Sequence, residues 1–298
     1  MSFDLDAAIE VVKNLALQAG ALSKQKFGTI PILVKEVKDK TVLKKYITES
    51  VTEVDYACQK LILEGLIKEG FNKYTGVIAE EDIDILKEFA DNPSLRWVID
   101  PIDGTYNYGT AHEESRKKLE ERFGMKIERN HKIYGVSIGL QENQRDFLLG
   151  VVYLPFWDEL FVAAKGRGAT LDGQDIRMDK SKEFNDDLLI SLGGRADFGK
   201  TVFKRWEQPI CVVYSATGVI NKHDSYVGAS LNLHDVGAST LIIEEAGGYV
   251  SDEFGNDIKD TKAFKTGGDK LPYYIAGPSK EFNLALLDKC RKSGFEFK

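Results

Sequence analysis

Cysteine and histidine are both scarce in this sequence, and each shortage argues against a class of site. The three cysteines, Cys58, Cys211 and Cys290, are far apart and show no Cys-x-x-Cys spacing, which argues against disulfides and a thiolate zinc site. Only four histidines are present and no Gly-x-Ser-x-Gly segment occurs, so a Ser-His-Asp hydrolase has little support. The cysteine usage favours a reducing compartment, and we expect a cytoplasmic protein.

Long apolar runs and an excess of basic residues are also missing. No segment approaches the roughly 18 apolar residues of a membrane span. The first 20 residues alternate acidic and apolar positions at helical spacing, unlike the basic start and apolar core of a signal peptide. With 47 acidic and 40 basic residues the formal charge is -7, which argues against a general binder of nucleic acid. We therefore expect neither a membrane nor a nucleic-acid polymer as a partner.

The apolar pattern of the 298 residues predicts a mixed α and β chain without repeats or low-complexity linkers. Helices are expected over residues 1–20, 54–67, 236–246 and 280–291. Strands are expected over residues 76–78, 95–99, 188–192, 210–214 and 273–276, and as an antiparallel meander over 134–140, 147–154 and 159–164. The polar stretch 181–187 predicts a boundary between one domain over residues 1–184 and a second over 185–298.

The most informative segment is the acidic turn Trp-Val-Ile-Asp-Pro-Ile-Asp-Gly-Thr at residues 97–105. Its proline stiffens the turn directly after a strand and its glycine permits a tight backbone path, so Asp100 and Asp103 are held together. Hard cations such as Mg²⁺ prefer oxygen ligands, and this turn offers two carboxylates, a backbone carbonyl and the hydroxyl of Thr105. Taken alone, the same pattern also fits carboxylates that merely cap the turn and a following helix.

Two further acidic segments are candidates for the same site. Glu80 and Glu81 end an apolar run ahead of Asp100, so an acidic pair and the acidic turn lie at the ends of two neighbouring strands. Like charges brought together in this way repel unless a cation holds them. Downstream, His234 and Asp235 open an amphipathic helix, where Asp235 alone is also explained as an ordinary N-cap.

Four separated acidic elements together resemble the inositol monophosphatase family of magnesium-dependent, lithium-sensitive phosphatases. They are Val-Thr-Glu-Val-Asp at 51–55, the pair Glu80-Glu81, Asp-Pro-Ile-Asp-Gly-Thr at 100–105, and Asp-Val-Gly-Ala-Ser at 235–239 followed by Glu-Ala-Gly-Gly at 245–248. Their order and approximate spacing agree over nearly the whole chain. The resemblance implies an α+β or α/β fold, a layered α/β/α/β sandwich with an antiparallel N-terminal sheet and a mixed C-terminal sheet.

The resemblance also implies a metal centre with two or more Mg²⁺ ions. The first metal site of the family is resembled here by Glu80, Asp100, the carbonyl of Ile102 and Thr105. The second is resembled by Asp100, Asp103 and Asp235. Each of these positions retains a side chain or carbonyl that can bind a hard cation.

The same resemblance implies catalytic and substrate-binding residues. Asp55 and Thr105, together with Glu80, resemble the catalytic residues, and the first two would orient and deprotonate the attacking water. The backbone amides of Gly104 and Thr105 would hold phosphate oxygens at a helix start. Substrate contacts are expected from Arg195 and Thr217.

The implied function is Mg²⁺-dependent hydrolysis of a small phosphorylated polyol or sugar, with inositol monophosphate as the first candidate. A 3′(2′),5′-bisphosphate nucleotidase or a fructose-1,6-bisphosphatase-type activity on the same scaffold is the alternative, and a non-catalytic metal- or phosphate-binding protein is a third interpretation. The resemblance further implies a homodimer and inhibition by lithium.

Two departures from the family pattern put inositol specificity in doubt. Between Tyr108 and Tyr134 the family usually has a short loop, whereas this chain carries a longer stretch in which eight of the twelve residues 111–122 are charged. This stretch fits either a solvated helix with Glu–Lys pairs or a lid over the site. Before Asp235 the segment 226–230 lacks the acidic residue that usually helps hold inositol hydroxyls, and His234 stands in place of the usual Trp.

Overall fold

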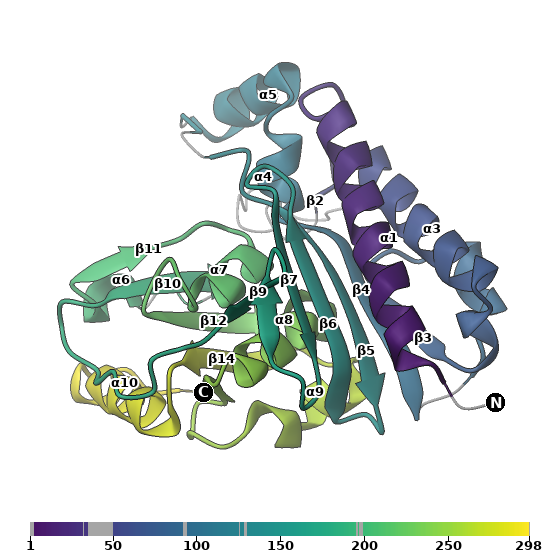
Figure 1. The fold of residues 1–298 in the computed structure, drawn as a ribbon. Helices are drawn as coiled ribbons and strands as arrows, with labels where there is room; N and C mark the ends of the chain where they lie inside the picture. The colour runs from purple at the N-terminus through teal and green to yellow at the C-terminus, as the bar shows by residue number, and fades with distance from the viewer. Residues whose placement is uncertain are drawn as a thin grey trace.

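Two large β-sheets with layers of helices around and between them form the protein (Figure 1). The structure is a computed structural model. It describes residues 3–31, 33–34, 50–91, 94–124, 126–127, 130–194, 196 and 199–297. A short antiparallel pair, β1 (Leu33–Val34) and β2 (Ser50–Val51), lies outside the two sheets.

The larger sheet has seven strands in the order β3-β4-β5-β6-β7-β8-β9. Their bounds are β3 Gly76–Ala79, β4 Leu95–Asp103, β5 Gly135–Glu142, β6 Asp146–Leu154, β7 Glu159–Ala164, β8 Ala169–Leu171 and β9 Gln174–Ile176. The expected antiparallel meander is confirmed in β5, β6 and β7. However, β3 and β4 are parallel, so the sheet is mixed, because the connection through a 3-10 helix (Asp84–Glu88) returns the chain to the same end.

The smaller sheet has five strands in the order β11-β10-β12-β14-β13. Their bounds are β10 Leu189–Gly194, β11 Arg205–Glu207, β12 Ser225–Leu231, β13 Tyr249–Ser251 and β14 Leu271–Gly277. β10 is parallel to β11 and β12, whereas β14 is antiparallel to β12 and β13. This confirms the expected mixed C-terminal sheet.

Two helices, α1 (Leu5–Lys26) and α3 (Glu53–Lys68), cover one face of the larger sheet (Figure 1). In α1 the buried positions Ala8, Val12 and Leu15 recur every three or four residues, so one stripe of the helix packs against the sheet. The other face of this sheet packs against α8 (Leu233–Glu245) and α7 (Val212–Gly218), in a core that also contains residues of the smaller sheet.

The outer face of the smaller sheet is covered by α10 (Lys280–Lys292), with α6 (Gly199–Val202) beside it. Phe282, Leu286 and Leu287 form the buried stripe of α10. The layered α/β/α/β fold is therefore confirmed, and α10 adds a further helical layer. In the described part of the chain, every helix is too short or too polar to cross a lipid bilayer. The division into domains at residues 184 and 185 stays a prediction.

The charged stretch after the acidic turn forms α5 (Glu113–Phe123), beyond the short α4 (Thr105–Gly109) at one end of the larger sheet (Figure 1). Ion pairs four residues apart join Lys117 to Glu113 and Lys118 to Glu114, as the solvated-helix interpretation predicts. The alternative of a lid stays open, because these pairs do not bear on substrate access.

One expected strand is wrong. Residues 210–214 do not form a strand, since α7 begins at Val212 after the N-cap Cys211. The two valines favour a strand locally, but tertiary contacts in the core between the two sheets override that preference.

The three other expected helices, over 54–67, 236–246 and 280–291, match α3, α8 and α10 within a few residues. The first helix extends past residue 20 to Lys26, and α9 (Lys262–Thr266) is short.

Candidate active site

The acidic turn joins the end of β4 to α4. In β4, Trp97 and Ile99 belong to the core under α1 and α3, whereas Val98 belongs to the core between the sheets. Asp100 shares the parity of Val98, so the strand alternation directs it toward the space between the sheets. The register of the β4–β5 ladder shifts between Asp100 and Asp103, so both carboxylates can reach the same space although the residues are three positions apart.

Gly104 is required at this turn for two reasons. Its φ of 90° lies in the left-handed region, where a side chain is disfavoured. A Cβ atom built there would also lie 3.0 Å from the carbonyl oxygen of Ile133, which is tighter than ordinary packing allows. The glycine therefore lets the backbone turn directly into α4, which begins at Thr105.

Glu80 follows β3, and its backbone N–H donates to the carbonyl of Ile99 at 3.2 Å. This bond extends the parallel pairing of β3 and β4, so Glu80 comes beside Asp100 at the carboxyl end of both strands. Gln59 of α3 fixes the next residue, because its amide both donates to and accepts from the backbone of Glu81. The expectation that both acidic segments end neighbouring strands is thus confirmed.

Asp55 and Thr105 form a direct hydrogen bond, although they lie fifty residues apart. The hydroxyl oxygen of Thr105 is 2.8 Å from Oδ1 of Asp55 and also 2.8 Å from the carbonyl oxygen of Ile102. The other oxygen of Asp55 accepts from the backbone N–H of Thr52 at 2.8 Å, which closes a capping box at the start of α3. One carboxylate therefore both caps a helix and orients a hydroxyl at the acidic turn.

Asp103 is held by the start of α7. Its Oδ2 accepts a hydrogen bond from the backbone N–H of Val213 at 2.6 Å, and the thiol of Cys211 lies 3.2 Å from the same oxygen. These contacts connect the turn of the larger sheet to the C-terminal half of the chain. They also fix the Asp103 side chain, so a ligand would meet a preorganised carboxylate.

Asp235 lies in the first turn of α8. The N-cap is Asn232, whose backbone N–H donates to Oδ2 of Asp235 at 2.7 Å. Asp235 is thus the N3 residue of a capping box and not the N-cap itself. The neighbouring His234 places Nε2 3.4 Å from Oδ1 of Asp235.

The fold brings these residues into three overlapping groups whose potential ligand atoms lie within 4.8 Å of one another. The groups are Asp100 with Asp103 and Asp235, Glu80 with Asp100 and His234, and Asp55 with Glu80 and Glu81. Asp100 and Glu80 each belong to two groups, so the three form one continuous acidic cluster.

The cluster fits divalent cations on the chemistry of its donors. All but one of the side chains are carboxylates, the ligands that Mg²⁺ prefers. Oε2 of Glu80 is buried and finds no hydrogen-bond donor among the residues that the structure describes. A buried acceptor without a donor is costly, and a bound cation would remove that cost.

Burial and mutual repulsion raise the pKa values of these carboxyls. Burial is the main cause in each case. It raises the pKa of Asp55 to about 6, and that of Asp103, with the Asp235 charge adding to the effect, to about 7. The pKa values of Glu80 and Asp100 are raised well above their usual range by burial, and then by neighbouring carboxylates. Without cations the cluster therefore retains protons near neutral pH.

This electrostatic state predicts a pH-dependent effect of Mg²⁺ on stability. Asp55 and Asp103 hold protons in the folded protein that the unfolded chain releases above about pH 4, so metal-free stability should fall as pH rises from 5 to 8. Bound cations replace those protons. We expect Mg²⁺ to raise Tm more at pH 8 than at pH 5, measured by thermal unfolding after dialysis against chelator. An equal rise at both pH values would contradict this coupling.

The structure places most predicted site residues together. Asp55, Glu80, Asp100, Asp103 and Asp235 belong to the cluster, and Gly104, Thr105 and the carbonyl of Ile102 lie on the same turn. Their roles in metal, phosphate and water binding stay predictions. Arg195 lies outside the described residues. Thr217 is fully buried in α7, and its hydroxyl donates to the carbonyl of Val213, a geometry that gives no support to a substrate contact.

Four residues of the site have no predicted role. Glu81 and His234 belong to the cluster, and Cys211 and Val213 hold Asp103. The acidic pair and the His-Asp pair are visible in the sequence, but the pattern does not show which member reaches the cluster. No sequence signal indicates the contacts of Cys211 and Val213, because they depend on α7, and the local sequence favours a strand there.

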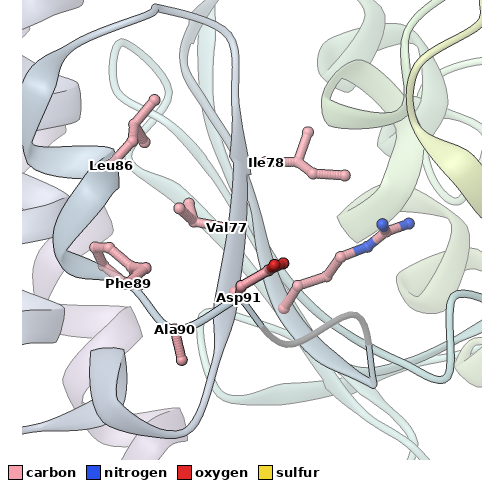
Figure 2. A pocket seen from close by; sticks show the side chains of 8 residues that line it. Val77, Ile78, Leu86, Phe89, Ala90 and Asp91 are labelled. Atoms are coloured by element: carbon pink, nitrogen blue, oxygen red, sulfur yellow. The ribbon is translucent and has the colours of Figure 1, made fainter.

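A cavity of about 320 Å³ lies beside β3 and is separate from the cluster. Figure 2 shows Val77, Leu86 and Phe89 on one side of the strand and Ile78 on the other, as alternation along a strand requires. None of the cluster residues lines this cavity, and we assign the functional site to the carboxylates.

Comparisons with known proteins agree with this site. The model of the inositol monophosphatase family matches residues 4–281. A "Nus factor SuhB" from Haemophilus influenzae is 29% identical over 275 residues, covering 85% of this chain and 87% of the relative. A "Fructose-1,6-bisphosphatase/inositol-1-monophosphatase" from Thermotoga maritima is 29% identical over 241 residues, covering 78% and 79%.

Among solved structures, an IMPase/NADP phosphatase complexed with NADP and Ca²⁺ superimposes with a TM-score of 0.75 over the full length of both chains, at 16% identity. That likeness shows the fold. The family match spans both sheets and the whole acidic cluster. The chain belongs to the inositol monophosphatase family and is a phosphatase that hydrolyses phosphate monoesters.

Proposed function

We propose that this phosphatase acts on a small phosphorylated polyol or sugar, with inositol monophosphate as the first candidate, and that two Mg²⁺ ions bind at the acidic cluster. The observation that carries the proposal is the convergence of Asp100, Asp103 and Asp235 within 4.8 Å, next to the hydrogen-bonded pair Asp55 and Thr105. A general binding module has no need to bury so many carboxylates beside an oriented hydroxyl.

The carboxylates would hold the ions. Asp100, Asp103 and Asp235 would bind one, while Glu80, Asp100, the Ile102 carbonyl and Thr105 would bind the other. When bound, Mg²⁺ neutralises phosphoryl oxygens, acidifies the attacking water and stabilises the leaving oxygen. The hydrogen bonds that fix Asp103 and Asp235 reduce the entropy lost on binding.

The pair Asp55 and Thr105 would move the proton of the attacking water. Oγ1 of Thr105 accepts that proton while the hydroxyl of Thr105 donates its own to Oδ1 of Asp55. A pKa of about 6 makes the Asp55 carboxylate a usable base near neutral pH. The backbone amides of Gly104 and Thr105 would meanwhile orient the phosphate at the start of α4.

Phosphate release from a substrate panel tests this function. The panel contains inositol monophosphates, fructose 1,6-bisphosphate and adenosine 3′,5′-bisphosphate, each with Mg²⁺ and with excess chelator. We expect Mg²⁺-dependent release with the highest kcat/KM for an inositol monophosphate. A preference for fructose 1,6-bisphosphate would favour the alternative that the name of the Thermotoga maritima relative suggests. Release that is equal with and without metal would contradict the proposed mechanism.

Inhibition by lithium is a further expectation. The proposed site of Asp100, Asp103 and Asp235 would accept Li⁺ in place of one Mg²⁺ after hydrolysis and retain the phosphate product. We expect Li⁺ to slow phosphate release at saturating substrate, whereas K⁺ at the same concentration does not. Complete indifference to Li⁺, with Mg²⁺-dependent turnover intact, would mean that this site is built differently.

A homodimer, a cytoplasmic location and the lack of a nucleic-acid polymer partner stay proposals. The three cysteines are buried and free, which fits a reducing compartment. Two relatives carry the name "Nus factor SuhB". The name belongs to those two proteins and assigns no partner to this chain.

A further inference from the structure

His234 occupies the acidic cluster itself. It is the second residue of α8, and its side chain is only 14% exposed. The hydroxyl of Ser137 in β5 donates to the His234 carbonyl at 3.3 Å, so the start of α8 is fastened to the larger sheet. The start of α8 therefore lies against the strand ends that carry Glu80 and Asp100.

The position of the ring nitrogen matches a ligand position. One ring nitrogen of His234 and one carboxylate oxygen from each of Glu80 and Asp100 lie within 4.8 Å of one another. Atoms bound to one ion at about 2.1 Å lie at most roughly 4.2 Å apart, so a small side-chain adjustment would complete this arrangement. The buried Oε2 of Glu80, which finds no donor in the described part of the chain, belongs to the same group.

Imidazole changes the metal chemistry of the cluster. Carboxylates and carbonyls suit Mg²⁺, whereas a nitrogen ligand suits first-row transition ions more than Mg²⁺. Mn²⁺ carries the same charge as Mg²⁺ and shares its liking for oxygen ligands, but as a first-row transition ion it binds a nitrogen donor more readily than Mg²⁺ does. A mixed set of two carboxylates and one imidazole would thus favour a transition ion such as Mn²⁺ over Mg²⁺ at this position.

We propose that His234 is a nitrogen ligand that binds, with Glu80 and Asp100, one of the active-site ions and shifts the preference of that position from Mg²⁺ toward a divalent transition metal such as Mn²⁺. The inference rests on the proposed metal-dependent function. The competing explanation is an ion pair, in which a protonated imidazole neutralises Glu80 and Asp100 and no metal–nitrogen bond forms.

Pulsed electron paramagnetic resonance of bound Mn²⁺ tests the proposal without measuring activity. We expect modulation from a directly coordinated ¹⁴N nucleus in the wild-type protein. Labelling only the histidines with ¹⁵N should replace it with the ¹⁵N pattern, a result that needs no variant. Mn²⁺ that binds without a histidine nitrogen signal would overturn the role of His234 and leave the metal-dependent function standing. Failure of the wild-type protein to bind Mn²⁺ or Mg²⁺ at all would overturn both.

Variants give a second readout. His234→Gln keeps a polar side chain with an oxygen donor but removes the imidazole. Because even indirect partners of a metal contribute about 10–100-fold in affinity, we expect at least about tenfold weaker Mn²⁺ binding and a much smaller change for Mg²⁺. His112→Gln is the matched control, since the His112 ring caps α5 and belongs to none of the three groups.

The Mn²⁺ to Mg²⁺ affinity ratio, measured by competition, should therefore fall in His234→Gln and stay unchanged in His112→Gln. An equal change for both ions in His234→Gln would contradict nitrogen ligation and favour the ion pair.

Discussion

Replacing Asp103 or Asp235 with asparagine should lower kcat by at least about a hundredfold, the order found when a single preorganised electrostatic contact is removed. In Asp103→Asn the amide oxygen must keep accepting from the N–H of Val213, which leaves an NH₂ group where the second carboxylate oxygen stood. An amide nitrogen repels a cation. The same reasoning applies to Asp235, whose Oδ2 accepts from the N–H of Asn232.

The metal-free variants should remain folded. Removing one negative charge from a buried, repelling cluster should leave Tm unchanged or raise it at pH 8. Asp175→Asn is the matched control, because Asp175 is exposed in β9 and lies outside the three acidic groups. Near-normal turnover of either cluster variant at saturating Mg²⁺ would contradict the proposed metal site of Asp100, Asp103 and Asp235.

Substitutions of Thr105 should give the other large effect. Two of them distinguish the role of the hydroxyl from that of the side-chain shape. Thr105→Val removes the hydroxyl that links to Asp55, so we expect kcat to fall by about 10²–10⁴-fold, the usual contribution of general acid–base catalysis. Thr105→Ser keeps the hydroxyl and loses only a methyl group. It should retain turnover within about tenfold of the wild type, since the proton path is intact.

The measurement is steady-state phosphate release at saturating Mg²⁺ and substrate, which gives kcat, with thermal unfolding as the control for folding. The valine variant also leaves Oδ1 of Asp55 without its Thr105 donor, which should lower metal-free stability by about 1–3 kcal/mol. Comparable loss of activity in the serine and valine variants would show that the hydroxyl is not the group that matters.

Much of this site can be predicted from the local sequence. Asp100, Asp103 and Thr105 lie on one short turn, and the proline and glycine there dictate its shape. The adjacency of Glu80 follows from two apolar runs that end on acids, since neighbouring strands bring their ends together. Asp55 and Asp235 are both helix-start residues in capping boxes, so the same carboxylates serve the local fold and the cluster.

Other parts depend on tertiary contacts that no local pattern reveals. The valines of α7 favour a strand, yet the segment is a helix whose first turn binds Asp103. The pattern does not indicate β12 either, because Gly228 and Ser230 interrupt its apolar residues, although it is the central strand of the smaller sheet. The approach of His234 to Glu80 and Asp100 likewise depends on how α8 packs against β5.

One cluster of buried carboxylates should hold the ions on which hydrolysis depends. The most direct test is Asp100, because it belongs both to the group with Glu80 and His234 and to the group with Asp103 and Asp235. The measurement is calorimetric titration of Mg²⁺ into chelator-treated wild-type protein and Asp100→Asn at pH 8. We predict saturable binding to the wild type and a loss of affinity for every ion in the variant. Binding by Asp100→Asn with the stoichiometry and affinity of the wild type would show that the ions bind elsewhere.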